Sequence, residues 1–269
     1  MNTKNKSLAS GQAADQKLKE IFFGHFAQSV KDEAVELDSK IGPDGTFLGS
    51  DGFRYLSRKA MPYSKAAIFS TGETVKKHRV YYFKLEPIRW IVLPHLSHED
   101  EVFLLSAQIL ENSALGKHGL IYKNSKIHSW LNLDFYNLAF SESERRRIIP
   151  SFTTSRSPYV AAALDLDKDG ELPQDYVMLP SRYDITAGTG NAEDVYKPVR
   201  MAYPTDYAIA GGASTDFACG FHLQGNIYDR EPTFSEANYY SSGIFGWLAD
   251  TDKKHGVIPT LRLRLTSLI

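Results

Sequence analysis

The chain has one cysteine, Cys219, among its 269 residues. A lone cysteine excludes an intramolecular disulfide, a cysteine-rich zinc site and any redox mechanism that needs two thiols. An excess of either charge is also missing, since 31 lysines and arginines are balanced by 32 aspartates and glutamates. This balance argues against capture of nucleic acid by bulk charge, although it leaves room for a local basic patch.

Long apolar runs are absent as well. No stretch approaches the roughly 18 consecutive apolar residues of a membrane-spanning helix, so we expect no membrane span. The first 17 residues, MNTKNKSLASGQAADQK, are small and polar, and no apolar run follows their lysines. We therefore expect residues 1–17 to be a flexible tail rather than a secretory signal, and residues 18–269 to be a single domain. We expect a cytoplasmic protein or a component of a phage virion.

The strongest strand signal lies at residues 81–93, YYFKLEPIRWIVL. This segment is aromatic and β-branched, and Pro87 either divides it in two or marks a bulge. Residues 101–109, EVFLLSAQI, follow after the polar turn HLSHED. Together the two segments predict an antiparallel hairpin.

Other strand and turn signals lie on either side of this hairpin. Residues 21–23 are a short apolar run that should end at Gly24, and residues 40–53 are rich in turn-forming residues. Residues 175–179, DYVML, predict a short buried strand. Residues 257–265 alternate leucine with arginine, which predicts a half-buried strand with leucines inward and arginines outward.

Residues 126–140, KIHSWLNLDFYNLAF, predict the main helix, because apolar residues recur every three or four positions. Ser141, with Glu144 three residues later, matches a capping box for a second short helix. That helix should run through residues 145–149 and stop before Pro150. These elements predict an α+β fold with a mixed or antiparallel sheet, one or two helices and long irregular loops.

One acidic motif is a candidate cation site. Asp165, Asp167 and Asp169 alternate ahead of Gly170, as in the first half of a calcium loop. The position of the closing bidentate carboxylate is occupied by Tyr176, however. We therefore interpret the segment as a polar turn and expect no cofactor, with calcium at these three aspartates as the alternative.

Three further clusters have simpler interpretations than chemistry. His95 and His98 precede two carboxylates and could bind zinc, but a solvated turn is the simpler hypothesis. The three arginines at residues 145–147 follow glutamates, which is typical of a helix face with mixed charge. The glycines of residues 186–191 and 211–212 lack the lysine and spacing of a phosphate-binding loop and are interpreted as turns.

Residues 221–247, FHLQGNIYDREPTFSEANYYSSGIFGW, have the composition of a recognition surface. Tyrosine supplies amphipathic contact area at low entropic cost, and Ser, Gly and Asn supply adaptable hydrogen bonds. Half of these aromatic residues could instead fill a core under long loops, and we expect that of Phe245 and Trp247. The residues that we predict to contact a ligand are Tyr228, Asp229, Arg230, Asn238, Tyr239, Tyr240 and Ser241.

Seven segments, taken in order, resemble an uncharacterised bacterial and phage domain family, a domain of unknown function. They are IFFGHFAQS, YYFKLEPIRWIVL, FLLSAQIL, SWLNLDFYNLAFSESE, DYVMLPS, TDYA and GVIPTLRLRL, and they cover about residues 20 to 265. The most specific is W-L-N-x-x-F-Y-x-x-A-F at residues 130–140, supported by the closing G-V-x-P-x-L-x-L strand. Where the family usually has W-L-R-S-P-G, this sequence has GFHLQG at residues 220–225.

The order of elements in that family is similar to the C-type-lectin-like fold of formylglycine-generating-type domains. The resemblance implies a compact α+β domain whose N- and C-terminal strands pair and whose long loops lie on one side. The cysteine oxidation of those enzymes does not transfer, because only Cys219 is present. What the resemblance does imply is ligand display, as in the variable proteins of diversity-generating retroelements.

We therefore expect a non-enzymatic binding protein whose C-terminal loops contact a protein or glycan ligand. We expect no binding of nucleic acid by bulk charge, and oligomerisation is left open. Trp130, Phe135, Tyr136 and Phe140 should belong to the scaffold rather than to the binding site. The alternatives are a metal-dependent enzyme of the same superfold and a phage structural or assembly component.

Overall fold

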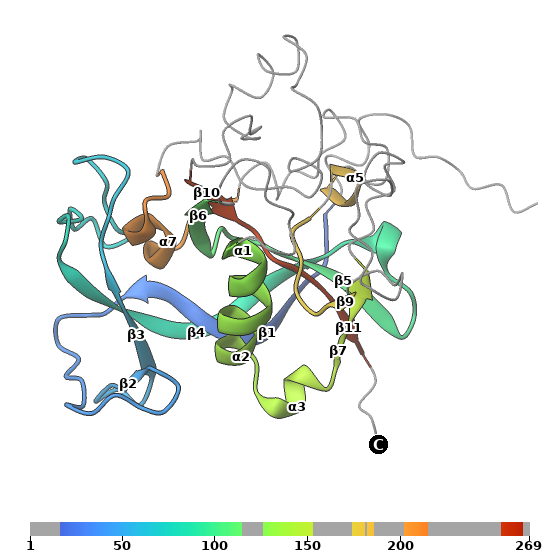
Figure 1. The fold of residues 1–269 in the computed structure, drawn as a ribbon, viewed down its shortest axis with the longest axis horizontal. Helices are drawn as coiled ribbons and strands as arrows, with labels where there is room; N and C mark the ends of the chain where they lie inside the picture. Colours follow the sequence, from blue (N-terminus) through green and yellow to red (C-terminus); the bar gives the residue numbers. More distant parts are fainter. Residues whose placement is uncertain are drawn as a thin grey trace, which may run out of the picture.

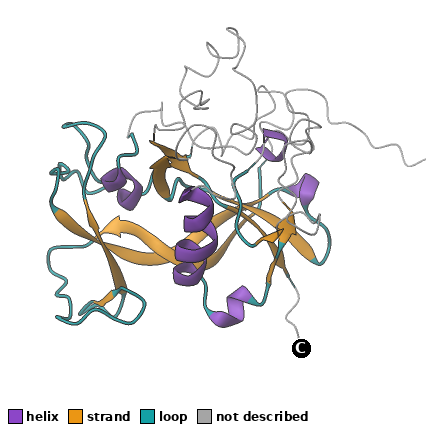
Figure 2. Cartoon of the chain, viewed as in Figure 1, coloured by secondary structure: helices purple, strands orange, loops and turns teal. Residues whose placement is uncertain are grey.

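The computed structural model describes residues 17–114, 126–152, 174–180, 182–185, 202–214 and 254–265. Its main feature is a curled antiparallel sheet (Figures 1 and 2). From one edge to the other the sheet contains β2 (Phe47–Leu48), β3 (Arg54–Lys59), β4 (Val80–Val92), β5 (Glu101–Ser106), β11 (Thr260–Arg264) and β7 (Ile148–Ile149), and β1 (Glu20–Val30) pairs with β4. With a few short helices, this gives the predicted mixed α+β class.

Strand β4 is 13 residues long and pairs with three other strands. Phe83 lies opposite Leu56 of β3 and Val30 of β1, whereas Trp90 lies opposite Ser106 of β5 and Ile21 of β1. Strands β3 and β5 therefore share one edge of β4, and β1 occupies the other. The predicted hairpin between residues 81–93 and 101–109 is confirmed.

Pro87 does not divide β4, because the strand is continuous through it. Strand β3 pairs with β4 as far as Lys84, and β5 pairs with it only from Trp90 onward. Pro87 lies in the interval between these two ladders, where its missing N–H removes no hydrogen bond to β3 or β5. It is also solvent-exposed.

Gly24 bends β1 but does not end it, so the prediction of a strand confined to residues 21–23 is wrong. The strand continues to Val30, with a register shift between Phe22 and His25. Gly24 has φ +68°, and its amide donates a hydrogen bond to Glu144 Oε1 at 3.2 Å. Because glycine adopts positive φ without strain, it accommodates a β-bulge here instead of a strand end.

The main helix covers one face of the sheet (Figure 1). It consists of α1 (Lys126–Ser129), the π-helical turn η3 (Trp130–Phe135) and α2 (Tyr136–Ala139), and the helical backbone continues across both junctions. The helix predicted at residues 126–140 is thus confirmed, whereas its π turn has no signal in the periodicity.

A capping box starts the next helix, α3 (Glu142–Arg145), as predicted. The Ser141 hydroxyl accepts a hydrogen bond from the Glu144 amide, and the Glu144 carboxylate accepts one from the Ser141 amide. The predicted extension of this helix through residues 145–149 is wrong. Ile148 and Ile149 instead form β7 and pair with β11, because β-branched side chains favour a strand where a partner is available.

Two hydrophobic cores lie on the two faces of the sheet. Along β5, Val102 and Leu104 belong to the core beneath the helix, and Phe103 and Leu105 belong to the second core. This burial of both faces explains why the segment has a continuous apolar run instead of an alternating one.

The core beneath the helix is rich in aromatic side chains. Trp90 is fully buried, and its indole donates a hydrogen bond to the Phe23 carbonyl oxygen at 2.7 Å. Of the residues that we expect to be scaffold, Phe135 and Phe140 are buried here, and Trp130 and Tyr136 pack against the same core.

The C-terminal strand β11 shows the predicted alternation. Leu261 and Leu263 are buried, and Arg262 and Arg264 are half-buried, although Leu265 lies past the strand end and is exposed. Strand β11 pairs with β5 and β7. The N-terminal strand β1 pairs with β4, so the expected pairing of the N- and C-terminal strands is wrong in the described part of the chain. The physical reason is that β4 and β5 lie between them.

Two smaller sheets complete the described architecture. Strand β6 (Glu111–Ala114) pairs with β10 (Lys254–Val257), and β8 (Ser151–Phe152) pairs with β9 (Gln174–Asp175). The strand predicted at residues 175–179 is shorter than expected, because only its first residue belongs to β9. Val177, Met178 and Leu179 are nevertheless buried, and Met178 forms an isolated bridge with Thr260 of β11.

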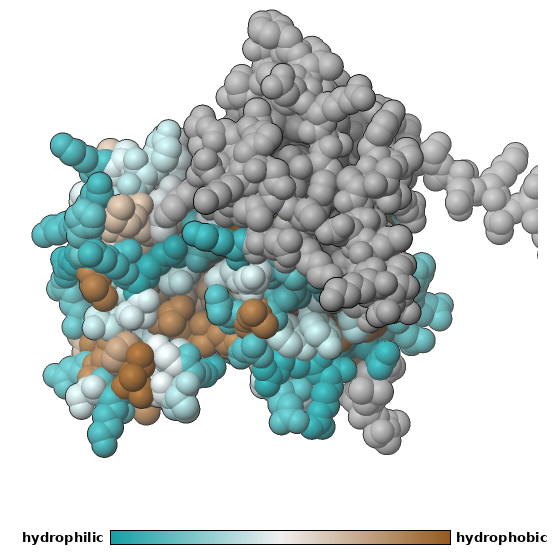
Figure 3. Space-filling model, in the orientation of Figure 1, coloured by the Kyte–Doolittle hydropathy of each residue, from teal (hydrophilic) through white to brown (hydrophobic). Residues whose placement is uncertain are grey.

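The turns predicted at residues 40–53 lie on either side of β2. Ile41, Leu48 and Phe53 of this segment are exposed. Figure 3 shows apolar surface at this end of the molecule and further apolar surface toward the middle of the same face.

Replacement of Gly24 by alanine should destabilise the protein by about 2–4 kcal/mol. A Cβ atom at this position would lie 2.5 Å from Phe140 Cε1 and 2.9 Å from the Ala139 carbonyl oxygen. Urea denaturation of wild type and Gly24→Ala measures the loss. Gly45→Ala is the matched control, because Gly45 also has a positive φ of +79° but a Cβ atom there would have no other atom within 4 Å. This variant should therefore lose only the about 1 kcal/mol that a left-handed backbone costs a residue other than glycine. Equal losses in the two variants would contradict the steric explanation.

Candidate functional site

The residues predicted to bind a ligand lie outside the described residues and stay predictions. They are Tyr228, Asp229, Arg230, Asn238, Tyr239, Tyr240 and Ser241. The same holds for the alternative calcium ligands Asp165, Asp167 and Asp169 and for the glycine-containing turn at 186–191. The structure does describe the elements to which residues 215–253 are attached at either end.

Both attachments contact one residue of β6. Helix α7 (Asp206–Gly211) ends at Gly212, whose φ of +108° makes it a left-handed C-cap and confirms the turn predicted at 211–212. The Asn112 side chain donates a hydrogen bond to the Gly211 carbonyl oxygen at 3.4 Å. Asn112 also lies opposite Gly256 of β10 in the β6–β10 ladder. The chain therefore leaves and rejoins the described fold beside the same strand.

A buried ion pair holds α7 against β3 and β6. Arg58 Nη2 lies 2.6 Å from Glu111 Oε1, and its guanidinium lies 4.3 Å from the centre of the Tyr207 ring. Desolvation by itself would lower the pKa of Arg58, but the charge of Glu111 raises this pKa and keeps the guanidinium cationic. Glu111 Oε1 also accepts a hydrogen bond from the Asn112 amide at 2.7 Å, so the pair is linked to the strand that contacts both attachments.

Asp206 ties the N-terminus of α7 to two other parts of the fold. Its buried carboxylate accepts hydrogen bonds from the Ser70 amide at 2.7 Å, the Ser70 hydroxyl at 2.8 Å and the Val30 amide at 2.9 Å. Thr205 is the N-cap and accepts a hydrogen bond from the Ala208 amide at 3.2 Å. The Thr-Asp pair is a helix-start signal that could have been found in the TDYA segment.

His128 and Asp175 form a second buried polar centre. His128 Nε2 lies 2.7 Å from Asp175 Oδ1, with side-chain exposures of 18% and 5%. A carboxylate that holds an imidazole in this way fixes the orientation of the ring, as an acid–base residue requires. In this fold the pair joins α1 to β9. A single histidine in an apolar helix pattern was too weak a signal to predict it.

Asn132, in the π turn, pairs with the backbone of residues 176–177. Its Oδ1 atom accepts hydrogen bonds from the Tyr176 amide at 3.0 Å and the Val177 amide at 3.1 Å, and its Nδ2 donates to the Val177 carbonyl oxygen at 3.0 Å. The side-chain amide thus takes the place of a neighbouring strand. A polar residue inside an apolar helical pattern is the signal that could have identified Asn132. Beside this contact, the Tyr136 and Tyr176 rings stack with centroids 4.7 Å apart.

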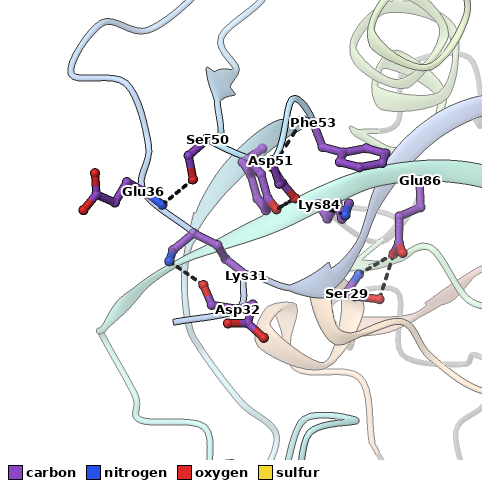
Figure 4. Close-up of polar contacts among 10 residues, drawn as sticks. Ser29, Lys31, Asp32, Glu36, Ser50, Asp51, Phe53, Lys84 and Glu86 are labelled. Carbon is purple, nitrogen blue, oxygen red and sulfur yellow. Dashed lines mark hydrogen bonds and ion pairs between the residues drawn. The ribbon is translucent and has the colours of Figure 1, made fainter. Parts of the chain in front are cut away.

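A third polar group fastens the loop after β2 to the outer face of β3 and β4 (Figure 4). Asp51 Oδ2 accepts hydrogen bonds from the Tyr55 hydroxyl at 2.7 Å and from Lys84 Nζ at 3.1 Å, while Lys84 lies 3.4 Å from the centre of the Phe53 ring. Desolvation and the hydrogen bond to Asp51 raise the pKa of Tyr55. Desolvation by itself would raise the pKa of Asp51, but the hydrogen bonds that its carboxylate accepts lower this pKa below its ordinary value.

Glu86 continues this polar surface along β4. Its carboxylate accepts hydrogen bonds from the Ser29 hydroxyl at 2.7 Å and the Ser29 amide at 3.1 Å (Figure 4). Like the Asp51 group, this contact joins segments of the fold to one another. We therefore interpret both as structural.

The arginines at residues 145–147 are used within the fold, in agreement with the prediction of a helix face with mixed charge. Arg146 forms an ion pair with Glu142, four residues earlier. Arg145 donates a hydrogen bond to Asn137 Oδ1 at 2.7 Å, and Arg147 donates one to the Arg264 carbonyl oxygen at 3.3 Å.

The part of the chain that the structure describes contains no cluster of side chains suited to binding a metal ion. There, no three side chains of the His, Cys, Asp or Glu type lie close enough together to hold a metal ion. His95, in the short 3₁₀ helix η1 (Pro94–Leu96), and the exposed His98 are among these residues and belong to no such cluster.

Among the described helices, none has the length and apolarity needed to cross a membrane.

A profile of the family described as "Domain of unknown function (DUF6273)" matches residues 99–206, which is less than half of the chain. The match includes His128, Asn132 and Asp175 and reaches the first residue of α7. It agrees with the resemblance to an uncharacterised domain family. Comparisons with curated proteins and with solved structures found no match.

Replacement of Asn132 by alanine should reduce the free energy of unfolding by about 2–4 kcal/mol. The substitution removes four hydrogen bonds, three to the backbone of residues 176–177 and one to the His128 carbonyl oxygen. It leaves the backbone groups of Val177, which is buried, without these partners. Urea denaturation measures the loss. Asn137→Ala is the control, because Asn137 is exposed and its side-chain oxygen accepts a hydrogen bond from Arg145 at the protein surface. A loss in Asn132→Ala no larger than in the control would contradict this role.

Tyr207 should make the protein sensitive to alkaline pH. Burial raises the pKa of Tyr207 to about 12, above its ordinary value of 10.0. A folded-state pKa above the unfolded value means that the stabilisation is complete below about pH 10 and is lost as the pH rises toward 12. The difference in unfolding free energy between wild type and Tyr207→Phe should therefore fall by about 2 kcal/mol between about pH 9 and pH 12.

Urea denaturation at several pH values measures this difference. Tyr63→Phe is the control, because Tyr63 is 74% exposed and its substitution should leave the pH profile unchanged. A Tyr207→Phe variant with the same alkaline loss as wild type would show that another group is responsible.

Proposed function

We propose that this chain is a non-enzymatic binding protein that presents residues 221–247 to a protein or glycan ligand. The observation that carries the proposal is the attachment of residues 215–253 at both ends to Asn112 of β6, through Gly211 on one side and Gly256 on the other. Binding residues are commonly carried on loops that a rigid scaffold positions. Helix α7, β6 and β10 would form that scaffold here.

The rigidity of this scaffold comes from buried polar contacts. The Arg58–Glu111 ion pair joins β3 to β6, and the Asp206 carboxylate joins α7 to Ser70 and to the end of β1. Removal of one partner from such a buried pair leaves an uncompensated charge, so the arrangement resists rearrangement. A scaffold that is already ordered lowers the entropy lost when its loop binds a partner.

The composition of the attached segment indicates how it would bind. Tyrosines in a background of Ser, Gly and Asn combine rigid contact area with adaptable hydrogen bonds. Most of the binding energy should come from a few aromatic anchors, each contributing about 2 kcal/mol or more. Tyr228, Tyr239 and Tyr240 are the anchors that we propose, with Asp229, Arg230, Asn238 and Ser241 as polar neighbours.

In its most specific form, the proposal makes the chain a C-type-lectin-like variable protein of a diversity-generating retroelement. A reverse-transcriptase gene with a template repeat beside the gene for this protein would support that form. The separation of β1 from β11 in the sheet gives it no support. Binding is therefore supported by the attachment of the segment and by its composition.

Replacement of both Tyr239 and Tyr240 by alanine should weaken ligand binding at least about 30-fold, the effect of losing one anchor of about 2 kcal/mol. Labelled wild-type protein would first be titrated on a glycan array and on a microarray of purified bacterial proteins. The variant would then be titrated on each saturable target.

The control is Phe22→Ala with Leu133→Ala, which removes two side chains that are 68% and 60% exposed on the described fold. It should bind like wild type. Binding unchanged by loss of the tyrosines, or no saturable target on either array, would contradict the proposal. Stoichiometric calcium in the purified protein, lost when Asp165, Asp167 and Asp169 are replaced by asparagine, would favour the metal-dependent alternative.

A further inference from the structure

The connection between β3 and β4 forms a basic surface of the described fold (Figure 1, upper left). Residues 59–80 contain five cationic side chains and one acidic side chain, Glu73, which gives them a formal net charge of +4. Because the whole chain has a net charge of -1, the remainder is acidic by comparison. The exposed cationic residues are Lys59, Lys65, Lys76, Lys77 and Arg79, with His78 exposed among them.

Most of these cations are available to a partner. Arg79 lies 3.4 Å from Glu73, and both side chains are well exposed, so this ion pair is weak. Within the described ranges, none of the four lysines forms an ion pair. By contrast, other cationic residues are engaged, such as Arg58 with Glu111 and Lys84 with Asp51.

The backbone of this basic surface is held in place by hydrogen bonds. The Ala60 amide donates to the Arg79 carbonyl oxygen at 2.8 Å, and the His78 amide donates to the Ala60 carbonyl oxygen at 2.7 Å. A turn closes with the Arg79 amide on the Lys76 carbonyl oxygen at 3.2 Å, and within it His78 adopts φ +68°. This conformation is uncommon for residues other than glycine, so the surrounding contacts hold the turn that carries the lysines.

Exposed apolar side chains lie in the same connection. Met61, Tyr63, Ile68 and Val80 are 42%, 74%, 47% and 49% exposed. Val80 lies directly opposite Lys59 in the β3–β4 ladder, which places an apolar and a cationic side chain next to each other. Figure 3 shows a mainly hydrophilic surface at this end of the molecule, with single apolar residues within it.

We propose that residues 59–80 bind the surface of an anionic lipid membrane. Lysines close to such a surface are attracted to its negative potential, and each strengthens binding about fivefold. The exposed aliphatic residues would enter the headgroup region. Single-stranded nucleic acid fits less well, since it requires several stacking aromatics and this connection exposes Tyr63 alone among its aromatic residues. A protein partner fits less well too, because lysine is depleted in protein interfaces.

The test is cosedimentation of the full chain with vesicles made of equal parts phosphatidylcholine and phosphatidylserine. Lys76→Gln with Lys77→Gln should weaken binding about 25-fold, since each lysine contributes about fivefold. Met61→Ser with Ile68→Ser should also weaken it, and this loss should persist at high salt, where the contribution of charge is screened. Circular dichroism checks that each variant is folded. The test involves no residue of 221–247, so its outcome is independent of the proposed ligand-binding function.

Lys19→Gln with Lys40→Gln is the matched control, because it removes the same charge from exposed lysines elsewhere. This variant should bind within about twofold of wild type. Equal binding to vesicles of phosphatidylcholine alone, no binding to either vesicle, or an equal loss in the control would overturn the proposal. Tighter binding to a single-stranded oligothymidylate than to the vesicles would overturn it in favour of nucleic acid.

Discussion

Hydrogen bonding along β4 constrains the position of almost every other described element. Strands β3 and β5 use different halves of one edge of β4, and β1 uses the other. Segments distant in sequence are therefore held in one sheet. The faces of this sheet form two cores, one beneath the main helix and one on the opposite side. Because β4 contributes Phe83 and Trp90 to the first core and Ile91 to the second, its pairing and both cores depend on each other.

Buried polar contacts then determine where the remaining parts attach. Apolar packing is not directional, whereas a buried carboxylate must find hydrogen-bond donors in a defined geometry. Asp206 finds them on Ser70 and Val30, and Glu111 finds them on Arg58 and Asn112. These contacts position α7 beside β6, which is why residues 215–253 leave and rejoin the fold at one place. The proposed display of residues 221–247 follows from this placement.

The two proposed surfaces have different origins in the sequence. Segment 221–247 stands out by its composition, whereas the basic surface at residues 59–80 is diluted in the chain by acidic residues elsewhere. The overall balance of charge argues against capture of polyanions by bulk charge, but it could not reveal a local excess. Only the fold shows that the lysines of this connection are exposed and lie outside ion pairs within the described ranges, since the sequence does not say which charges will be neighbours.

The sequence by itself determined the α+β class, the β4–β5 hairpin, the main helix, the capping box at Ser141 and the alternation in β11. All of these are local patterns, in which the period of apolar residues or a cap specifies the backbone. Tertiary structure decided the bulge at Gly24, the change of residues 148–149 from helix to strand, and the separation of β1 from β11. It also decided the partners of Asn132, His128 and Asp206. Each of these depends on a contact between residues far apart in the chain, which local propensity cannot specify.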